Sequence, residues 1–353
     1  MSIDTLGWTS SFENALRPYR DAGFIPARIA REDRERYQVL TAENELRAEI
    51  TGRFRHQVRT RADFPAVGDW VALEIQPRSE FGLIHAVLPR RSIFSRKMTG
   101  PTTEEQVVAA NIDTAFLVMD LGRDYNPRRI ERYLTLTWES GAAPVILLTK
   151  TDVADDVDSA IAEIESIALG VPVHAICALQ AKGLDQLEPY LTIGRTVALF
   201  GSSGAGKSTL INALLGEDRL LTRELKDDGR GKHATTWREL IQLPSGAVVV
   251  DTPGMKQVEL WADESSLDES FDDVSLLATT CKFTDCSHSS EPGCAVQAAL
   301  ADGTLQLERF ESYLKLQREL KYLHRKQDVR AMLEEKARWK RIHMSVRRQY
   351  KQR

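Results

Sequence analysis

A glycine-rich segment that ends in lysine and serine lies in the second half of the 353-residue chain. It follows the pattern G-x-x-x-x-G-K-S, directly after the apolar run TVALFG and directly before the helical run TLINALLG. In such a loop the backbone N–H groups close around phosphate oxygens, the lysine reaches the β- and γ-phosphates, and the serine binds Mg²⁺. The segment therefore predicts a nucleotide site made of Gly201, Ser202, Ser203, Gly204, Ala205, Gly206, Lys207, Ser208 and Thr209.

A second motif, Asp251-Thr-Pro-Gly254, ends the apolar run AVVV further along the chain. At the end of a strand, a D-x-x-G motif brings a carboxylate close to bound Mg²⁺ and a glycine N–H close to the γ-phosphate. We therefore expect Asp251 beside the metal, together with Ser208, and Gly254 as the group that senses the γ-phosphate.

Two motifs that come before the phosphate loop indicate which base is bound. Thr149-Lys150-Thr-Asp152 ends the run PVILL and resembles the guanine-binding N-K-x-D motif, with threonine in place of asparagine. The carboxylate of Asp152 can accept hydrogen bonds from guanine N1–H and the 2-amino group, a pairing that adenine cannot supply. A helix start capped by threonine is the structural alternative. Cys177-Ala178, after the next apolar run, resembles the S-A loop whose backbone N–H contacts guanine O6.

The order of these motifs is reversed relative to ordinary small GTPases, in which the phosphate loop comes first. Here Asp152 and Ala178 precede Gly201. A circular permutation can reconnect strands without moving the loops that form the site. The sequence therefore predicts a circularly permuted GTP-binding domain.

A cluster of metal-binding residue types follows the nucleotide motifs. Cys281-x4-Cys286-x-His288-x5-Cys294 supplies three thiolates and one imidazole, the ligand set of a closed tetrahedral zinc site. Four protein ligands leave no position for a reacting water, so we expect one structural Zn²⁺ that holds together a segment poor in apolar residues. Unrelated free cysteines are the alternative interpretation.

The elements that position these motifs fall into three parts of the chain. Short alternating apolar runs between Gly23 and Arg96 predict a small all-β barrel of the OB type. Apolar runs then alternate with helical stretches, which is typical of a mostly parallel sheet covered by helices on both faces. The expected divisions are 1–22 (N-terminal extension), 23–97 (OB-fold RNA-binding domain), 98–110 (linker), 111–265 (permuted α/β GTPase domain) and 266–353 (α-helical zinc-binding domain with a basic tail).

Charge is distributed unevenly along the chain. The formal net charge is −4, yet residues 313–353 contain 14 Lys and Arg against 4 Asp and Glu. The arginine-rich segment 52–63 could follow a phosphate backbone, or could be a solvated hairpin, and the tail could contact RNA or pack as a solvated helix. No apolar run approaches the ~18 residues that span a membrane, and no signal peptide is visible, so we expect a cytoplasmic protein without a membrane partner.

The combination of an OB-type barrel, permuted GTPase motifs and the C-x4-C-x-H-x5-C cluster resembles one family over nearly the whole chain. This is the family of RsgA ribosome small-subunit-dependent GTPases, also called the YjeQ or YloQ family. The resemblance implies a GTPase that binds the 30S ribosomal subunit and its 16S rRNA late in assembly and leaves after hydrolysing GTP to GDP. We expect it to act as a monomer, with Mg²⁺ bound beside the nucleotide.

The resemblance also suggests roles for residues 229–236, which look like the family's first switch segment. His233 and Thr235 match the family's His-Thr-Thr pattern, whereas Ala234 departs from it and leaves the Mg²⁺-binding threonine open between Thr235 and Thr236. Met255 stands where Ras-like enzymes carry a water-orienting glutamine, so the resemblance makes His233, with Lys207, the candidate catalytic group. A solvent-facing loop histidine is the alternative.

Two other functions are compatible with the same motifs. A P-loop kinase would need an acceptor site but no preference for guanine, so competition between ATP and GDP distinguishes it. A zinc-dependent RNA-binding module could use GTP only as a structural ligand, and would then show no hydrolysis even with 30S subunits.

Overall fold

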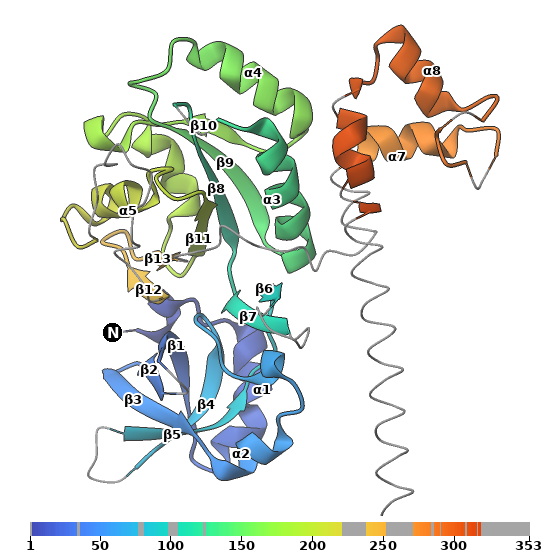
Figure 1. Cartoon of the computed structure of the whole chain (residues 1–353). Coiled ribbons are helices and arrows are strands. Elements are labelled where there is room, and N and C mark those ends of the chain that lie inside the picture. Colours follow the sequence, from blue (N-terminus) through green and yellow to red (C-terminus); the bar gives the residue numbers. More distant parts are fainter. Residues whose placement is uncertain are drawn as a thin grey trace, which may run out of the picture. The chain divides into compact units, whose positions relative to one another are not determined.

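The computed structural model of the chain (Figure 1) describes residues 2–33, 36–76, 81–97, 105–122, 125–220, 238–251, 271–283, 286–289, 291–307, 309–315 and 317–318. Internal contacts divide the chain into two units, Met1–Met98 with Glu104–Glu259 and Thr99–Thr103 with Leu260–Arg353. None of the helices in the described ranges has the length and hydrophobicity needed to cross a membrane.

Five strands of the first unit close into a barrel. They are β1 (Ile25–Asp33), β2 (Arg36–Leu40), β3 (Glu45–Ile50), β4 (Trp70–Ile75) and β5 (Phe81–Val87). The ladder runs β1-β2-β3-β5-β4, and an antiparallel pairing of β1 with β4 closes it. Alternate side chains fill the interior, among them Ile29, Val39, Val71, Leu73 and Ile84. The predicted OB-type barrel is confirmed.

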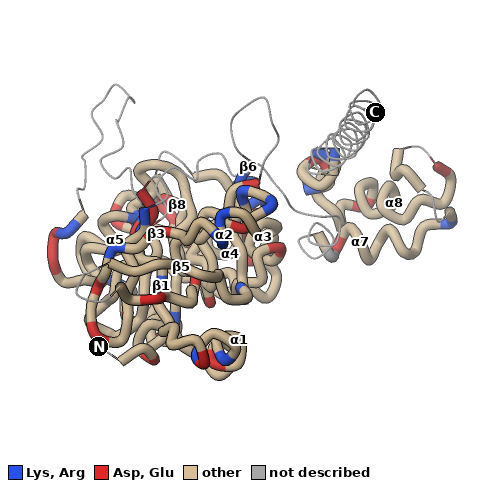
Figure 2. Tube along the Cα trace, turned by 90° about the horizontal axis from the view of Figure 1, so that it is seen from below, with Lys and Arg blue, Asp and Glu red and all other residues tan. Residues whose placement is uncertain are grey.

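Short helical segments cover this barrel. The first residues, expected to be an extension, form η1 (Ile3–Leu6) and α1 (Ser10–Arg20), whose Leu6, Phe12 and Leu16 pack with Trp70 of the barrel. The arginine-rich segment is not a hairpin: it forms α2 (Gly52–Gln57), capped by the hydroxyl of Thr51, and η2 (Arg61–Asp63). The arginines of α2 are exposed. Figure 2 shows where Lys and Arg fall along the chain trace.

A mostly parallel sheet forms the other half of the first unit. Its order is β10 (Val173–Ala175), β9 (Ala143–Thr149), β8 (Thr114–Asp120), β11 (Thr196–Gly201) and β13 (Val248–Asp251), with β12 (Glu239–Gln242) antiparallel at the end. The parallel strands match the apolar runs expected from the sequence, whereas β12 was not expected. The permuted α/β fold is confirmed by this topology.

Helices cover both faces of that sheet (Figure 1). On one face, Ala115 and Leu117 of β8 pack with α3 (Pro127–Ser140) and α4 (Val157–Ile167). On the other face, Phe116 and Val118 pack with η4 (Leu184–Tyr190) and α5 (Lys207–Leu215). Because successive side chains of a strand point to opposite faces, burial on both faces explains why these strands read as continuous apolar runs.

The barrel and the parallel sheet are joined by the pairing of one strand from each. β12 pairs with β1 at Arg31 and Glu239, so the barrel and the α/β sheet form a single 11-stranded sheet. The region 98–110, expected as a linker, contains β7 (Glu105–Ala110), which pairs with β6 (Ile93–Lys97). The two halves of the first unit are therefore connected by backbone hydrogen bonds and not only by a tether.

A buried arginine reinforces this junction. Arg28 of β1 is 1% exposed, and its guanidinium donates to the carbonyl oxygens of Leu6, Gly68 and Asn111 and to Oγ1 of Thr196 at the start of β11. Burial lowers the pKa of Arg28 to about 10, which still leaves the side chain charged at neutral pH. One cation thus satisfies acceptors from the N-terminal segment, the barrel and the α/β sheet.

The second unit contains α7 (Asp272–Thr279) and α8 (Ala295–Asp302). Arg309 pairs with both carboxylate oxygens of Asp273, at 2.5 and 2.7 Å, and its guanidinium lies 4.8 Å from the ring centre of Phe271. The aromatic rings of Phe271, Phe310 and Tyr313 pack together beside this pair. The basic tail beyond residue 318 lies outside the described residues.

We predict that Arg28→Ala lowers the free energy of unfolding of the first unit by about 3 kcal/mol or more, because the carbonyl oxygens of Leu6 and Asn111 lose their guanidinium donor and that of Gly68 keeps only the side-chain amide of Asn111. Urea unfolding followed by tryptophan fluorescence measures this change. Arg36→Ala is the matched control: the Arg36 side chain is 81% exposed in its pair with Glu49, so its removal should change stability by less than about 0.5 kcal/mol. Equal losses of unfolding free energy for the two variants would contradict the role of Arg28 in stabilising the junction.

Candidate nucleotide and metal sites

The phosphate loop connects β11 to α5, and two of its glycines are required by geometry. A Cβ atom on Gly201 would lie 2.3 Å from the carbonyl oxygen of Val118 on the neighbouring strand β8. Gly206 has a φ of 91° in the left-handed region and is the residue before the first turn of α5. Ser208 and Thr209 follow in that first turn, whose N–H groups have no intrahelical acceptor and can bind an anion.

Lys207 and Asp251 lie together at the carboxyl end of the sheet. The ammonium of Lys207 donates to the carbonyl oxygens of Gly201 at 2.9 Å and Ser202 at 2.6 Å, so the loop itself holds it in place. Asp251 ends β13 opposite Leu199 of β11 and is 4% exposed. Burial raises the pKa of Asp251 to about 6, the charge of Lys207 lowers it and that of Glu239 raises it. A buried carboxylate in this environment is suited to a cation such as Mg²⁺.

The guanine motif contacts the phosphate loop directly. Oγ1 of Thr149 donates to the carbonyl oxygen of Ala205 at 2.7 Å and lies 3.3 Å from that of Met119. This hydroxyl does not cap a helix: α4 begins at Val157 and is capped by Asp156, so the alternative interpretation of Thr149 is not supported. The T-K-x-D loop and the phosphate loop are therefore held side by side, although the chain reaches them in reversed order.

The remaining guanine-motif residues lie at the same edge of the sheet. Lys150 has a φ of 60°, and its Nζ forms an ion pair with Oδ2 of Asp120 at 3.1 Å. The thiol of Cys177 donates to Oδ1 of Asp152 at 3.2 Å, and Ala178 begins η3 (Ala178–Gln180). The structure thus brings together the Asp152 and Cys177 segments, which belong to different strand ends.

Sequence reasoning missed Asp120 and Glu239 near this site. Asp120 is the last residue of β8, and a polar residue at the carboxyl end of a buried parallel strand is a signal that could have identified it. Glu239 lies opposite Asp251 in the β12–β13 ladder, and nothing in its local sequence indicates that neighbour. Of the expected site residues, Gly254, His233, Thr235 and Thr236 lie outside the described residues.

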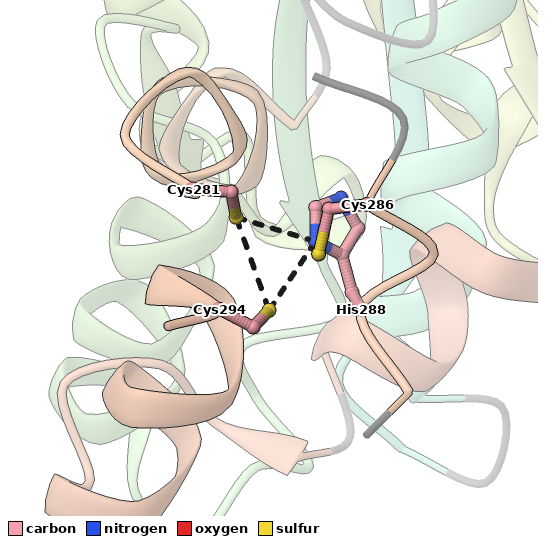
Figure 3. A group of neighbouring side chains, drawn as sticks. All are labelled: Cys281, Cys286, His288 and Cys294. Carbon is pink, nitrogen blue, oxygen red and sulfur yellow. Dashed lines mark hydrogen bonds between the residues drawn. The ribbon is translucent and has the colours of Figure 1, made fainter. Parts of the chain in front are cut away.

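The four expected metal ligands of the second unit converge on one point (Figure 3). Their ligand atoms all lie within 4.8 Å of one another. Sγ of Cys281 is 3.8 Å from Sγ of Cys294, and Nδ1 of His288 is 3.6 and 3.5 Å from these two sulfurs. A tetrahedral zinc has bonds of about 2.3 Å to sulfur and about 2.0–2.1 Å to nitrogen. Its ligand atoms are then about 3.8 Å apart for two sulfurs and about 3.5 Å apart for a sulfur and a nitrogen. The residues therefore fit a zinc ion.

Backbone groups support the same arrangement. His288 has a φ of 56°, an uncommon conformation for histidine, and its carbonyl accepts from Nε2 of Gln297 at 2.6 Å. Cys294 is the residue before α8, and its sulfur accepts from the N–H of Gln297. Hydrogen bonds of this kind favour a thiolate, the form of cysteine that binds metal.

Two known protein families match parts of the chain. The pattern described as RsgA GTPase matches residues 87–261, and the pattern described as 50S ribosome-binding GTPase matches residues 196–333. A protein of Opitutus terrae named small ribosomal subunit biogenesis GTPase RsgA is 48% identical over 98% of this chain and 97% of its own length. One of the same name from Oceanobacillus iheyensis, RsgA 1, is 45% identical over 91% of this chain and 92% of its own length.

Two solved structures share the architecture. YjeQ from Thermotoga maritima superposes with a TM-score of 0.62 at 27% identity, over 84% of this chain and 98% of that one. YloQ, described as a circularly permuted GTPase, gives a TM-score of 0.60 at 24% identity, over 84% of this chain and 95% of that one, which supports the fold alone. With barrel, permuted sheet and cysteine–histidine cluster all accounted for, and with relatives matched along nearly their full length, the chain belongs to the RsgA GTPase family.

Proposed function

We propose that this protein hydrolyses GTP to GDP and phosphate on the small ribosomal subunit during its late assembly, with hydrolysis stimulated by the subunit and coupled to release. The observation that carries the proposal is the match, over more than nine-tenths of both chains, to relatives named small ribosomal subunit biogenesis GTPase. The 50S ribosome-binding pattern covers only residues 196–333 and so describes part of the chain. A protein that acts on ribosomal subunits is expected in the cytoplasm, which agrees with the location expected from the sequence.

The geometry supports the chemistry of GTP binding. Asp152 reads the guanine edge, with Cys177 and Ala178 beside the base, and Lys150 packs along it while pairing with Asp120. The contact from Thr149 to Ala205 keeps this base-binding loop at a fixed separation from the phosphate loop. A ligand that has both guanine and a chain of phosphates satisfies both loops at once.

The hydrolysis step is assigned to residues at the phosphate end. Lys207 turns from the loop carbonyls to the β- and γ-phosphates and offsets the charge that develops during transfer to water. Ser208, Asp251 and Thr235 or Thr236 are the residues that would hold Mg²⁺, which when bound supplies further positive charge to the phosphates. Gly254 senses the γ-phosphate, and His233 positions the attacking water.

The second unit is proposed to hold one structural Zn²⁺ through Cys281, Cys286, His288 and Cys294. All four positions of a tetrahedral ion are then filled by protein, so the metal contributes stability and no reaction step. The described part of this unit has the short helices α7 and α8 and a small group of aromatic rings, so the metal contributes a large share of its stability.

We predict that Asp152→Asn lowers GDP affinity about 100-fold, because two charge-assisted hydrogen bonds to guanine are lost, and raises affinity for xanthosine diphosphate, whose 2-oxo group can accept from the new amide. Equilibrium titration with fluorescent nucleotides measures both constants. Asp155→Asn changes a nearby exposed carboxylate and should leave both affinities unchanged. Displacement of bound GDP by ATP as readily as by GTP in the unaltered protein would favour a kinase instead.

We predict that the purified chain contains about one zinc per molecule and that Cys294→Ser removes it. Metal analysis gives the stoichiometry, and thermal unfolding should show a lower melting temperature for a transition of the second unit, with GDP binding by the first unit retained. Cys177→Ser serves as the control, since this thiol lies in the first unit and its loss should leave the zinc content unchanged. A Cys294→Ser protein that keeps its zinc would refute the assignment.

We predict that 30S subunits accelerate steady-state GTP hydrolysis by at least tenfold, because the subunit orders groups that the free protein does not hold in line with the γ-phosphate. Phosphate release is measured with and without subunits at one nucleotide concentration, with 50S subunits as the control. Equal rates with and without 30S subunits would remove the proposed stimulation, and no hydrolysis in either case would indicate a binding module.

A further inference from the structure

Three charged residues lie in one row across the junction between the barrel and the nucleotide-binding sheet. Arg31 of β1 is the Cα partner of Glu239 of β12, and Glu239 is the Cα partner of Asp251 of β13. Directly opposed residues of antiparallel strands point to the same face, with Cβ atoms about 4.5–5.5 Å apart. The row therefore runs from the barrel to the carboxylate at the end of the phosphate-binding sheet.

The centre of this row is held by a second arginine. Nη2 of Arg219 donates to Oε1 of Glu239 at 2.8 Å. The chain next to Arg219 is anchored on the phosphate-loop helix, because the side-chain amide of Asn212 in α5 bonds both the N–H and the carbonyl of Leu220, each at 2.8 Å. Glu239 thus pairs with an arginine tied to the phosphate-loop helix and lies opposite an arginine of the barrel in the strand ladder.

Two carboxylates placed opposite each other repel, so the pair of Glu239 and Asp251 needs nearby positive charge. Glu239 and Asp251 are directly opposed in the β12–β13 ladder, which brings the two carboxylates close enough to interact electrostatically. Arg219, which pairs with Glu239, and Arg31, its Cα partner in β1, place positive charge near Glu239, and Lys207 places positive charge near Asp251. A divalent cation at Asp251 would feel all of these charges.

We propose that Glu239 is a positioning residue that strengthens Mg²⁺ binding at Asp251, and that Arg219 and the barrel residue Arg31 limit this effect by partly neutralising Glu239. The inference rests on the proposed role of Asp251 beside Mg²⁺. It adds a route by which the barrel influences the nucleotide site, since the charge of β1 acts on the metal end of the site through one intervening strand.

The proposal makes predictions of opposite sign for neighbouring residues. Glu239→Gln removes negative charge and should raise the Mg²⁺ concentration needed for half-saturation of the GDP complex by about threefold to tenfold. Arg219→Gln and Arg31→Gln leave Glu239 less neutralised and should lower that concentration by a similar factor. All three shifts should shrink as salt is added, because these side chains are partly exposed.

The experiment is a Mg²⁺ titration of the full-length protein with a fluorescent GDP analogue at low ionic strength. Glu49→Gln is the matched control, because Glu49 forms an ion pair with Arg36 elsewhere on the barrel and should not alter the Mg²⁺ dependence. GDP affinity measured without Mg²⁺ should be the same in all variants, which would show that the nucleotide site is intact.

The outcomes separate this inference from the function on which it rests. If Asp251→Asn alters the Mg²⁺ dependence and Glu239→Gln does not, the role of Glu239 is wrong and the Mg²⁺ site at Asp251 stands. If Asp251→Asn has no effect, both fail. If the glutamate and arginine variants all weaken Mg²⁺ binding, the row acts by holding the strands in place and not by charge, and the proposal is overturned.

Discussion

The hydrogen bond from the Thr149 hydroxyl to the carbonyl of Ala205 is the contact on which the nucleotide site depends. It joins the last residue of β9 to the loop after β11, two strands separated by β8 in a parallel sheet. Because all parallel strands end at the same edge, both loops meet there whatever order the chain follows. The permutation therefore changes the connections between strands and leaves the separation between the base and phosphate sites intact.

The same contact explains how threonine serves where related GTP-binding motifs carry asparagine. The position needs a short side chain that donates to a carbonyl of the phosphate loop, and a hydroxyl can do this as an amide can. The Thr149 hydroxyl also lies 3.3 Å from the carbonyl oxygen of Met119 of β8, so it contacts both neighbouring elements. The departure at Thr149 thus preserves the contact with the phosphate loop, while the proposed reading of the base falls to Asp152.

The sequence indicated the parts of the fold that are encoded locally. The apolar strands, the phosphate loop and the cysteine–histidine spacing each lie within a short window, and the structure has strands or clustered ligands at those places. Arg28 could not be recognised, because its partner Thr196 is 168 residues away and the surrounding run reads as an ordinary barrel strand. β12 and β7 were missed for other reasons: β12 has only four residues, and β7 lies in the region that was expected to be a linker.

The junction between the barrel and the α/β sheet makes them act as one body. A tethered barrel could bind a partner without any effect on the nucleotide, since a flexible linker transmits no orientation. Here β1 is hydrogen-bonded to β12, β12 to β13, and Arg28 spans the same boundary from β1 to the first residue of β11. Both strands that lead to the phosphate end, β11 and β13, are therefore in contact with the barrel or one strand from it. A partner that shifts the barrel must strain this junction or move these strands with it.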